Sequence, residues 1–243
     1  MMRLLDPLLD ALRALRANVM RSVLTTLGII IGVAAVIIMV SVGTGAEARV
    51  AKLIQSLGSN LIIVGPGTST SGGVRLGRGT RPTITEDDAT AIQHEVPGVH
   101  LVAPHVRGSG QVVFGNLNWS TLIEGVTPEY FEVREWTIAT GQAFTPEEVK
   151  GAAKVVLLGE AVVESLFPEQ NPLGQIIRIN RVPFTVVGVL KGKGQSPMGR
   201  DQDDVVFIPL STAKKRVLGG RRISGKIVGA IFVKAQTSEL VSE

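Results

Sequence analysis

The sequence contains an uncharged, apolar stretch from Ser22 to Ala46 that limits what the rest of the chain can be. This stretch is longer than the roughly 20 residues that a helix needs to cross the hydrocarbon core of a bilayer. Its centre, Ile29–Val42, is almost wholly aliphatic, so a helix here is apolar on every face. Such a helix belongs in a membrane or deep inside a large protein. Because the flanking charges also fit a membrane span, we predict a transmembrane helix over residues 22–46.

The charges before this span predict its orientation. Basic residues outnumber acidic ones there: Arg3, Arg13, Arg16 and Arg21 against Asp6 and Asp10. The positive-inside rule then places the N-terminus in the cytoplasm and residues 47–243 on the far side of the membrane. Leucines at helical spacing predict that residues 1–21 form an amphipathic helix in the cytoplasmic interface, the alternative being an unstructured basic leader.

A cleaved signal peptide is the main alternative to a permanent anchor, because Ala46-Glu47-Ala48 has the small-x-small form of a cleavage site. The apolar core exceeds the usual h-region of about 7–15 residues, however, and the basic leader is also long. We therefore favour the uncleaved anchor. Within the span, Gly28 and Gly32 form a small-xxx-small pair, which predicts close packing against another membrane helix.

The helix is predicted to continue beyond the membrane. Val50, Leu53, Ile54 and Leu57 recur at i, i+3, i+4 and i+7, and Gly58 stands where a helix would stop. Residues 47–58 are therefore predicted to be an amphipathic stalk.

The remaining chain alternates short strand and helix patterns, which favours a mixed α+β domain over residues 47–243, stalk included. A Gly-, Ser- and Thr-rich loop is expected at 65–81. Strands are predicted at 61–64, 99–106, 111–114, 120–126, 154–158, 176–179, 182–190, 205–210 and 227–235. Helices are predicted at 85–95, 127–131, 160–167 and 211–218, with a further capped start at Thr145.

Composition excludes several classes of site. The chain has no cysteine, so it has no disulfide framework, no thiol nucleophile and no sulfur-based zinc site. It also lacks a P-loop motif and a GxSxG motif. The net charge of +4 is scattered and aromatic residues make up 4%, which does not favour nucleic acid as a partner. His94, His100 and His105 have no spacing that fits a metal site, so no metal or other cofactor is predicted on this chain.

The one polar cluster lies in a Gly-rich loop, where Asp201, Asp203 and Asp204 follow Gly199 and Arg200. A calcium loop needs further oxygen ligands at fixed offsets and a distal glutamate, which are absent here. The neighbouring Arg200 favours a structural turn closed by a salt bridge. A ligand-binding or catalytic role is the alternative.

The second half of the chain resembles a known family. Residues 161–180 (AVVESLFPEQNPLGQIIRIN) and 182–220 are similar to the MacB-type periplasmic core domain of ABC transporter permeases, in the superfamily of FtsX- and LolC-type permeases. Stretches at 21–37, 57–64 and 123–136 extend the resemblance over nearly the whole chain.

The resemblance implies a fold and a length. In this family a first membrane helix precedes an extracytoplasmic domain of two lobes, here assigned by analogy to 60–130 plus the last strand, and to 131–220. Three more membrane helices follow in the family, and many members of its exporter branch carry an ATPase domain ahead of the first helix. We therefore expect this sequence, which ends at Glu243, to be a fragment of a longer permease.

The resemblance also implies a function. The chain would be a permease subunit of an ABC-type efflux system in the bacterial plasma membrane, exporting substrates such as macrolides, peptides or lipoproteins. ATP would be bound by a separate ATPase subunit, so the chain itself would not be an enzyme. Its partners would be a second copy or a paralogous permease, with a periplasmic adaptor and an outer-membrane channel where these exist. The motif loop of Gly199–Asp204 would lie at a moving or adaptor-facing surface.

Two other functions stay open from the sequence. The first is a membrane-anchored extracytoplasmic binding or adaptor protein without transport activity. The second is an extracytoplasmic enzyme that uses the loop of Asp201–Asp204.

Overall fold

The computed structural model describes residues 16–56, 60–67, 70–71, 74–75, 83–196, 199–219 and 225–237. The chain divides into two compact units, Met1–Lys52 and Leu53–Glu243. Most of the predicted amphipathic leader, residues 1–15, lies outside the described residues.

The first unit is dominated by one long helix, α2 (Val19–Ser56), of 38 residues. Its segment Val19–Glu47 is long and apolar enough to cross a membrane, and no other helix of the described residues is. The hydroxyl of Thr25 donates to the carbonyl of Arg21 at 2.8 Å, and that of Thr44 to Val40 at 3.0 Å, so both are satisfied within the helix. The predicted span and most of the predicted stalk therefore form one unbroken helix.

The packing predicted at Gly28 and Gly32 stays a prediction. A Cβ built on either glycine meets nothing within 4 Å, so both positions are open on the helix surface.

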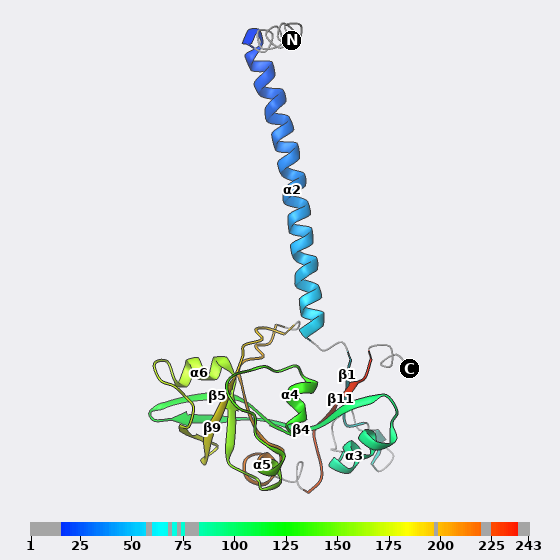
Figure 1. Ribbon diagram of the computed structural model, residues 1–243, viewed down its shortest axis with the longest axis vertical. Helices are drawn as coiled ribbons and strands as arrows, with labels where there is room; N and C mark the ends of the chain where they lie inside the picture. The colour runs from blue at the N-terminus through cyan, green and yellow to red at the C-terminus, as the bar shows by residue number, and fades with distance from the viewer. Residues whose placement is uncertain are drawn as a thin grey trace, which may run out of the picture. The chain divides into compact units, whose positions relative to one another are not determined.

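The second unit is built on a nine-stranded sheet with the order β1-β11-β4-β5-β10-β7-β9-β6, in which β8 also pairs with β4 and β9 (Figure 1). The strands are β1 (Leu61–Val64), β4 (Val99–Phe114), β5 (Leu117–Val126), β6 (Ile138–Gly141), β7 (Val155–Leu158), β8 (Ile176–Ile179), β9 (Val182–Leu190), β10 (Val205–Pro209) and β11 (Ala230–Ala235). The pairs β5–β10 and β7–β9 are parallel and the others are antiparallel. Inside the predicted loop 65–81, β2 (Thr70–Ser71) and β3 (Val74–Arg75) form a small separate sheet.

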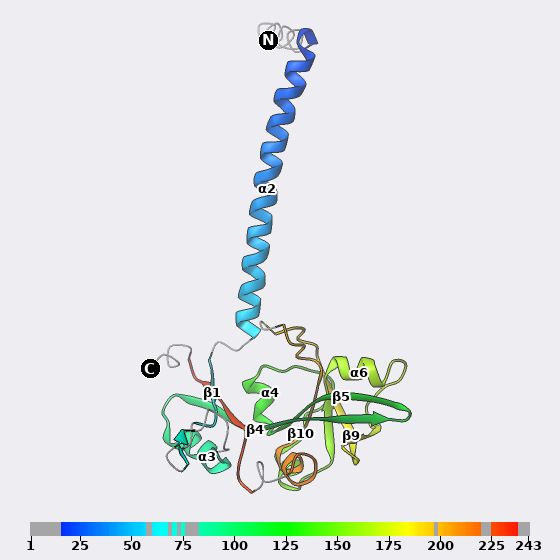
Figure 2. The same cartoon turned by 180° about the vertical axis from the view of Figure 1, so that it is seen from behind.

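Short helices lie against this sheet. They are α3 (Glu86–Glu95), α4 (Glu129–Val133), α5 (Pro146–Lys150), α6 (Glu160–Leu166) and α7 (Leu210–Thr212), which continues into the π-turn η2 (Ala213–Val217). In both views α3 lies at the end of the sheet near β1 and β11, and α6 near β9 (Figures 1 and 2). The capping boxes predicted at Thr85 and Thr145 are both present, with Asp88 and Glu148 as their acidic partners.

Strand β10 shows how the sheet separates two apolar clusters. All five of its residues are buried. Val206 and Ile208 belong to the cluster that includes α6, whereas Val205 and Phe207 belong to the cluster around α4. Because successive side chains point to opposite faces of a strand, both faces of the sheet are covered here. This arrangement confirms the predicted mixed α+β domain.

Several predicted boundaries are wrong, and β6 was not predicted. Residues 99–114, predicted as two strands, form the single strand β4 through Gly108 and Gly110. A side chain cannot replace these glycines without movement, since a Cβ at Gly110 would lie 2.5 Å from Oδ1 of Asn180. The helix predicted at 211–218 widens into η2, where the amide of Leu218 donates to the carbonyl of Ala213 at 2.8 Å.

The two predicted lobes share this one sheet. β10, assigned to the second lobe, pairs in parallel with β5, assigned to the first. The border between the lobes at residue 130 stays a prediction.

Candidate functional site

The predicted motif loop lies between β9 and β10 and folds into a closed turn. The amide of Ser196 donates to the carbonyl of Arg200 at 2.7 Å, and the amide of Gly199 donates to the carbonyl of Ser196 at 2.8 Å. Gly199 has a φ of +75°, a region that favours glycine. We call the described residues 191–196 and 199–204 the β9–β10 loop.

The three aspartates of the loop have separate partners. The buried carboxylate of Asp203 accepts the amides of Lys193 and Gly194, both at 2.8 Å. Asp201 accepts the amide of Asp203 at 2.8 Å, and Asp204 accepts the indole N–H of Trp119 at 2.8 Å. Their carboxylates therefore act mainly as acceptors that shape the loop.

The salt bridge expected from Arg200 is not formed in the described part of the loop, where no carboxylate lies within 4.0 Å of its guanidinium. Backbone donors to Asp203 close the loop instead. Residues 16–56, 60–67 and the described stretches after them contain no group of three His, Asp or Glu side chains placed to hold a metal ion.

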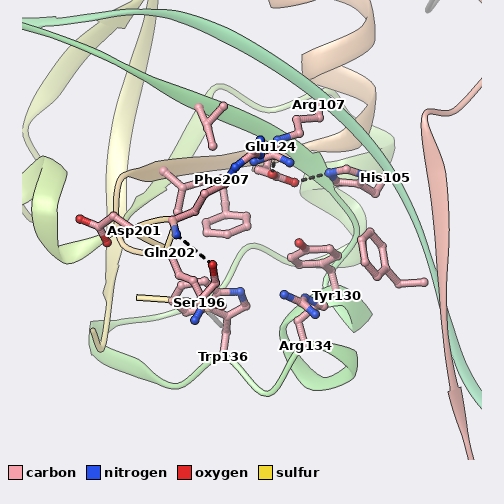
Figure 3. Close-up of a pocket in the computed structure, with 14 residues that line it drawn as sticks. His105, Arg107, Glu124, Tyr130, Arg134, Trp136, Ser196, Asp201, Gln202 and Phe207 are labelled. Carbon is pink, nitrogen blue, oxygen red and sulfur yellow. Dashed lines mark hydrogen bonds and ion pairs between the residues drawn. The ribbon is translucent and has the colours of Figure 1, made fainter. Parts of the chain in front are cut away.

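A cavity of about 210 Å³ lies under the β9–β10 loop (Figure 3). Its walls come from β4, β5, α4, β10 and β11, from the segment after α4 that carries Arg134 and Trp136, and from the β9–β10 loop with Ser196, Arg200, Asp201 and Gln202. Segments far apart in the sequence thus meet at one place.

A buried charge cluster forms one wall of the cavity. Glu124 of β5 contacts Nε2 of His105 and lies 3.2 Å from Nε of Arg107. Arg107 and Glu124 are directly opposite in the β4–β5 register, and His105 is two residues away on β4, hence on the same face. The carboxylate is only 9% exposed, and the ion pair with Arg107 offsets part of the cost of burying its charge.

Aromatic rings surround this cluster. Tyr130 of α4 stacks on His105 with ring centroids 5.7 Å apart, and Phe232 of β11 meets His105 edge-on at 5.2 Å. Burial, followed by the charge of Glu124, raises the pKa of Tyr130. The phenol is therefore neutral over the physiological pH range.

The three histidines do not converge. His105 is held by Glu124, while His100 lies on the surface with Nε2 3.3 Å from Oε1 of Glu132.

A lysine stands at the base of the β9–β10 loop. Nζ of Lys193 donates to the carbonyl of Arg134 and lies 4.7 Å from the ring centroid of Trp136. Burial, and secondly the charge of Arg134, lower the pKa of Lys193 to about 8.

This shift predicts a pH dependence. In the unfolded chain the pKa of a lysine is about 10.4. Between pH 8 and that value the unfolded chain binds more protons at Lys193 than the folded chain does, so the free energy of unfolding rises with pH. From pH 7 to pH 10 we expect wild type to gain about 1 kcal/mol relative to Lys193→Met, a value reduced for partial solvent exposure. Urea unfolding followed by tryptophan fluorescence measures it. Parallel pH profiles of the two proteins would contradict the assignment.

Sequence reasoning did not identify the cavity residues Arg107, Glu124, Tyr130, Arg134 and Trp136 as a site. One signal was available. Glu124 is the only charged residue in the apolar stretch Leu122–Val126, and a charge in a buried strand requires a partner on the neighbouring strand.

Comparison with known proteins gives consistent results. Residues 22–243 match the family described as MacB-like periplasmic core domain. The macrolide export ATP-binding/permease protein MacB of Syntrophobacter fumaroxidans is 47% identical over 210 residues, which is 86% of this chain and 29% of that protein. The protein of the same name from Chlorobaculum tepidum is 42% identical over 240 residues, covering 99% of this chain and 36% of that protein. The chain thus spans about a third of the length of these relatives.

Solved structures agree on the fold. The periplasmic region of MacB from Actinobacillus actinomycetemcomitans aligns with a TM-score of 0.62 and 26% identity, covering 78% of this chain and 82% of that one. The extracellular domain of the ABC-type transporter YknZ aligns with a TM-score of 0.59 and 17% identity, covering 75% and 87%, which shows likeness of fold alone.

Proposed function

Since the chain belongs to the family of MacB-like periplasmic core domains, we propose that it is the first membrane span and the extracytoplasmic domain of an ABC-type export permease. The observation that carries this proposal is the unbroken helix α2, which leads from the apolar segment Val19–Glu47 to Ser56, shortly before β1. A continuous helix has all its interior backbone hydrogen bonds formed, so it transmits displacement along its axis.

The proposed mechanism divides the work between subunits. An ATPase binds and hydrolyses ATP in the cytoplasm, and its closure displaces the membrane helices. Helix α2 carries that displacement to the domain, which drives substrate onward on the far side of the membrane. The relatives are named for macrolide export, so macrolides are the first substrate class to test, followed by peptides and lipoproteins.

The same proposal includes an assembly. The permease acts as a pair, either with a second copy or with a paralogous subunit, and Gly28 and Gly32 leave room for helix packing. A periplasmic adaptor and an outer-membrane channel would extend the path where the cell has an outer membrane. The β9–β10 loop, with Gly199–Asp204, would face the moving or adaptor-contacting surface.

Single-cysteine labelling tests the proposed topology, and the chain contains no native cysteine that would interfere. Asn18→Cys lies on the N-terminal side of the apolar segment, and Glu169→Cys is exposed in the domain. In intact spheroplasts a membrane-impermeant maleimide should label Glu169→Cys at once and Asn18→Cys only after permeabilisation.

The reverse labelling pattern would contradict the proposed orientation. Release of a soluble domain without residue 18 would instead indicate a cleaved signal peptide, and the permease proposal would fail with it.

A further inference from the structure

We propose that the cavity under the β9–β10 loop binds a small organic carboxylate with a planar, apolar body. This inference concerns a site within the domain and does not depend on transport activity.

The size of the cavity indicates a small ligand. Its volume of about 210 Å³ equals roughly seven liquid waters and is below the ~300–1,000 Å³ typical of pockets for drug-sized ligands. A macrocycle or a folded peptide is larger than this cavity. A molecule of one or two fused rings is the appropriate class.

The polar atoms of the cavity call for a hydrogen-bond acceptor. Nδ1 of His105, Nε of Arg134 and Nε2 of Gln202 line the cavity, are buried and have no hydrogen-bond partner among the described residues. An unsatisfied buried donor is costly, and native proteins usually provide it with a partner. The arginine and amide nitrogens are N–H donors, so the partner that they lack accepts hydrogen bonds.

The charges of the cavity favour an anion. Glu124 is already paired with the guanidinium of Arg107, which offsets its charge locally. The guanidinium of Arg134 has no carboxylate within 4.0 Å in the described residues, and Figure 3 shows it between Tyr130 and Trp136. A guanidinium is always charged, and its planar fork matches the two oxygens of a carboxylate.

The other walls favour a planar apolar body. Trp136 and Phe207 line the cavity with ring centroids 5.5 Å apart, and Tyr130 and Phe232 line it beside His105. A flat ring system can make offset or edge contacts with these rings while its carboxylate faces Arg134. In Figure 3 the carboxylate of Asp201 points away from the labelled aromatic rings, so it does not oppose such a ligand.

Calorimetric titration of the full chain in detergent tests the proposal with three probes. Indole-3-carboxylate has the charge and the planar body, indole-3-carboxamide has the shape without the charge, and inorganic phosphate has the charge without the body. We expect the carboxylate to bind at least tenfold more tightly than either of the others. Equal affinity for carboxylate and carboxamide would overturn the proposal.

Matched arginine variants locate the site. Arg134→Gln should weaken binding of indole-3-carboxylate at least tenfold, whereas Arg178→Gln, an exposed arginine on β8, should change it less than twofold. Equal effects of the two variants would overturn the proposal. If Arg134→Gln does not fold, Gln202→Leu provides the second test, with an expected loss of about threefold to tenfold.

An NMR titration that measures the pKa of Lys193 with and without ligand provides a further test. If Arg134 had only a structural role, the ligand would leave this pKa unchanged. A carboxylate bound beside Arg134 offsets the positive charge that helps to lower the pKa of Lys193, so saturating ligand should raise that pKa above its value of about 8. An unchanged pKa at saturation would place the ligand elsewhere and contradict the proposal.

Discussion

Replacing Asp203 by alanine is expected to lower the free energy of unfolding of the domain by about 3 kcal/mol. The buried carboxylate accepts two backbone amides, those of Lys193 and Gly194, at 2.8 Å each. Hydrogen bonds to a charged group contribute about 1.5–3 kcal/mol each, and the variant leaves both donors without their acceptor. The β9–β10 loop should therefore lose its closed form.

Urea unfolding measures this effect through the fluorescence of the chain's two tryptophans, Trp119 and Trp136, which both lie in the domain. The matched control is Asp201→Ala in the same loop, where an exposed carboxylate accepts one amide; we expect a loss of at most about 1 kcal/mol. Equal losses for the two aspartates would show that Asp203 does not hold the loop as described.

Replacing Ala48 by proline is expected to reduce ATP-driven export at least tenfold while leaving membrane insertion intact. Proline removes a backbone donor inside α2, and its ring clashes with the carbonyl one turn back, at Thr44, so the helix kinks or breaks at a cost of about 3 kcal/mol. The apolar segment Val19–Glu47 keeps its composition, so it can still enter the membrane.

Proteoliposomes that contain the permease and its ATPase measure this effect, with a radiolabelled macrolide as substrate. Ala48→Leu is the matched control, because leucine keeps a high helix propensity. ATP hydrolysis should continue in the proline variant, since the break lies between the ATPase and the domain. Export at the wild-type rate in Ala48→Pro would mean that α2 does not transmit the movement.

Local signals in the sequence predicted several elements. The uncharged stretch from Ser22 predicted a long helix, which is α2 in the structure. Thr85 and Thr145 predicted helix starts, and both begin helices with acidic partners three residues later. The apolar run at Val205–Pro209 predicted a strand buried on both faces. Each of these patterns is set by neighbouring residues, which is why it could be read from the chain alone.

Non-local pairings could not be predicted in the same way. β11, from the C-terminal part of the chain, lies between β1 and β4, and β10 pairs in parallel with β5. Nothing in the local composition of these strands specifies their neighbours. Two strands were predicted over 99–106 and 111–114, whereas β4 runs through Gly108 and Gly110, which lie close to Leu218 and Asn180.

The candidate site likewise has one part that the sequence indicated and one part that it did not. The Gly-rich loop of Gly199–Asp204 could be singled out from the sequence, but its aspartates were expected to pair with Arg200 and instead accept mainly backbone donors. The cavity below it combines side chains from five elements and a loop, so only the three-dimensional structure brings Glu124, Arg134 and Trp136 together.

The coupling of ATP to the domain is the central claim, and a distance measurement between paired permeases tests it most directly. Spin labels at Glu169→Cys in both copies report the separation of the two domains by pulsed electron spin resonance, in the nucleotide-free and ATP-trapped states. We predict that the distance distribution shifts when ATP is trapped and that Ala48→Pro abolishes the shift. Identical distributions in the two states, in a complex that hydrolyses ATP, would contradict the proposed function.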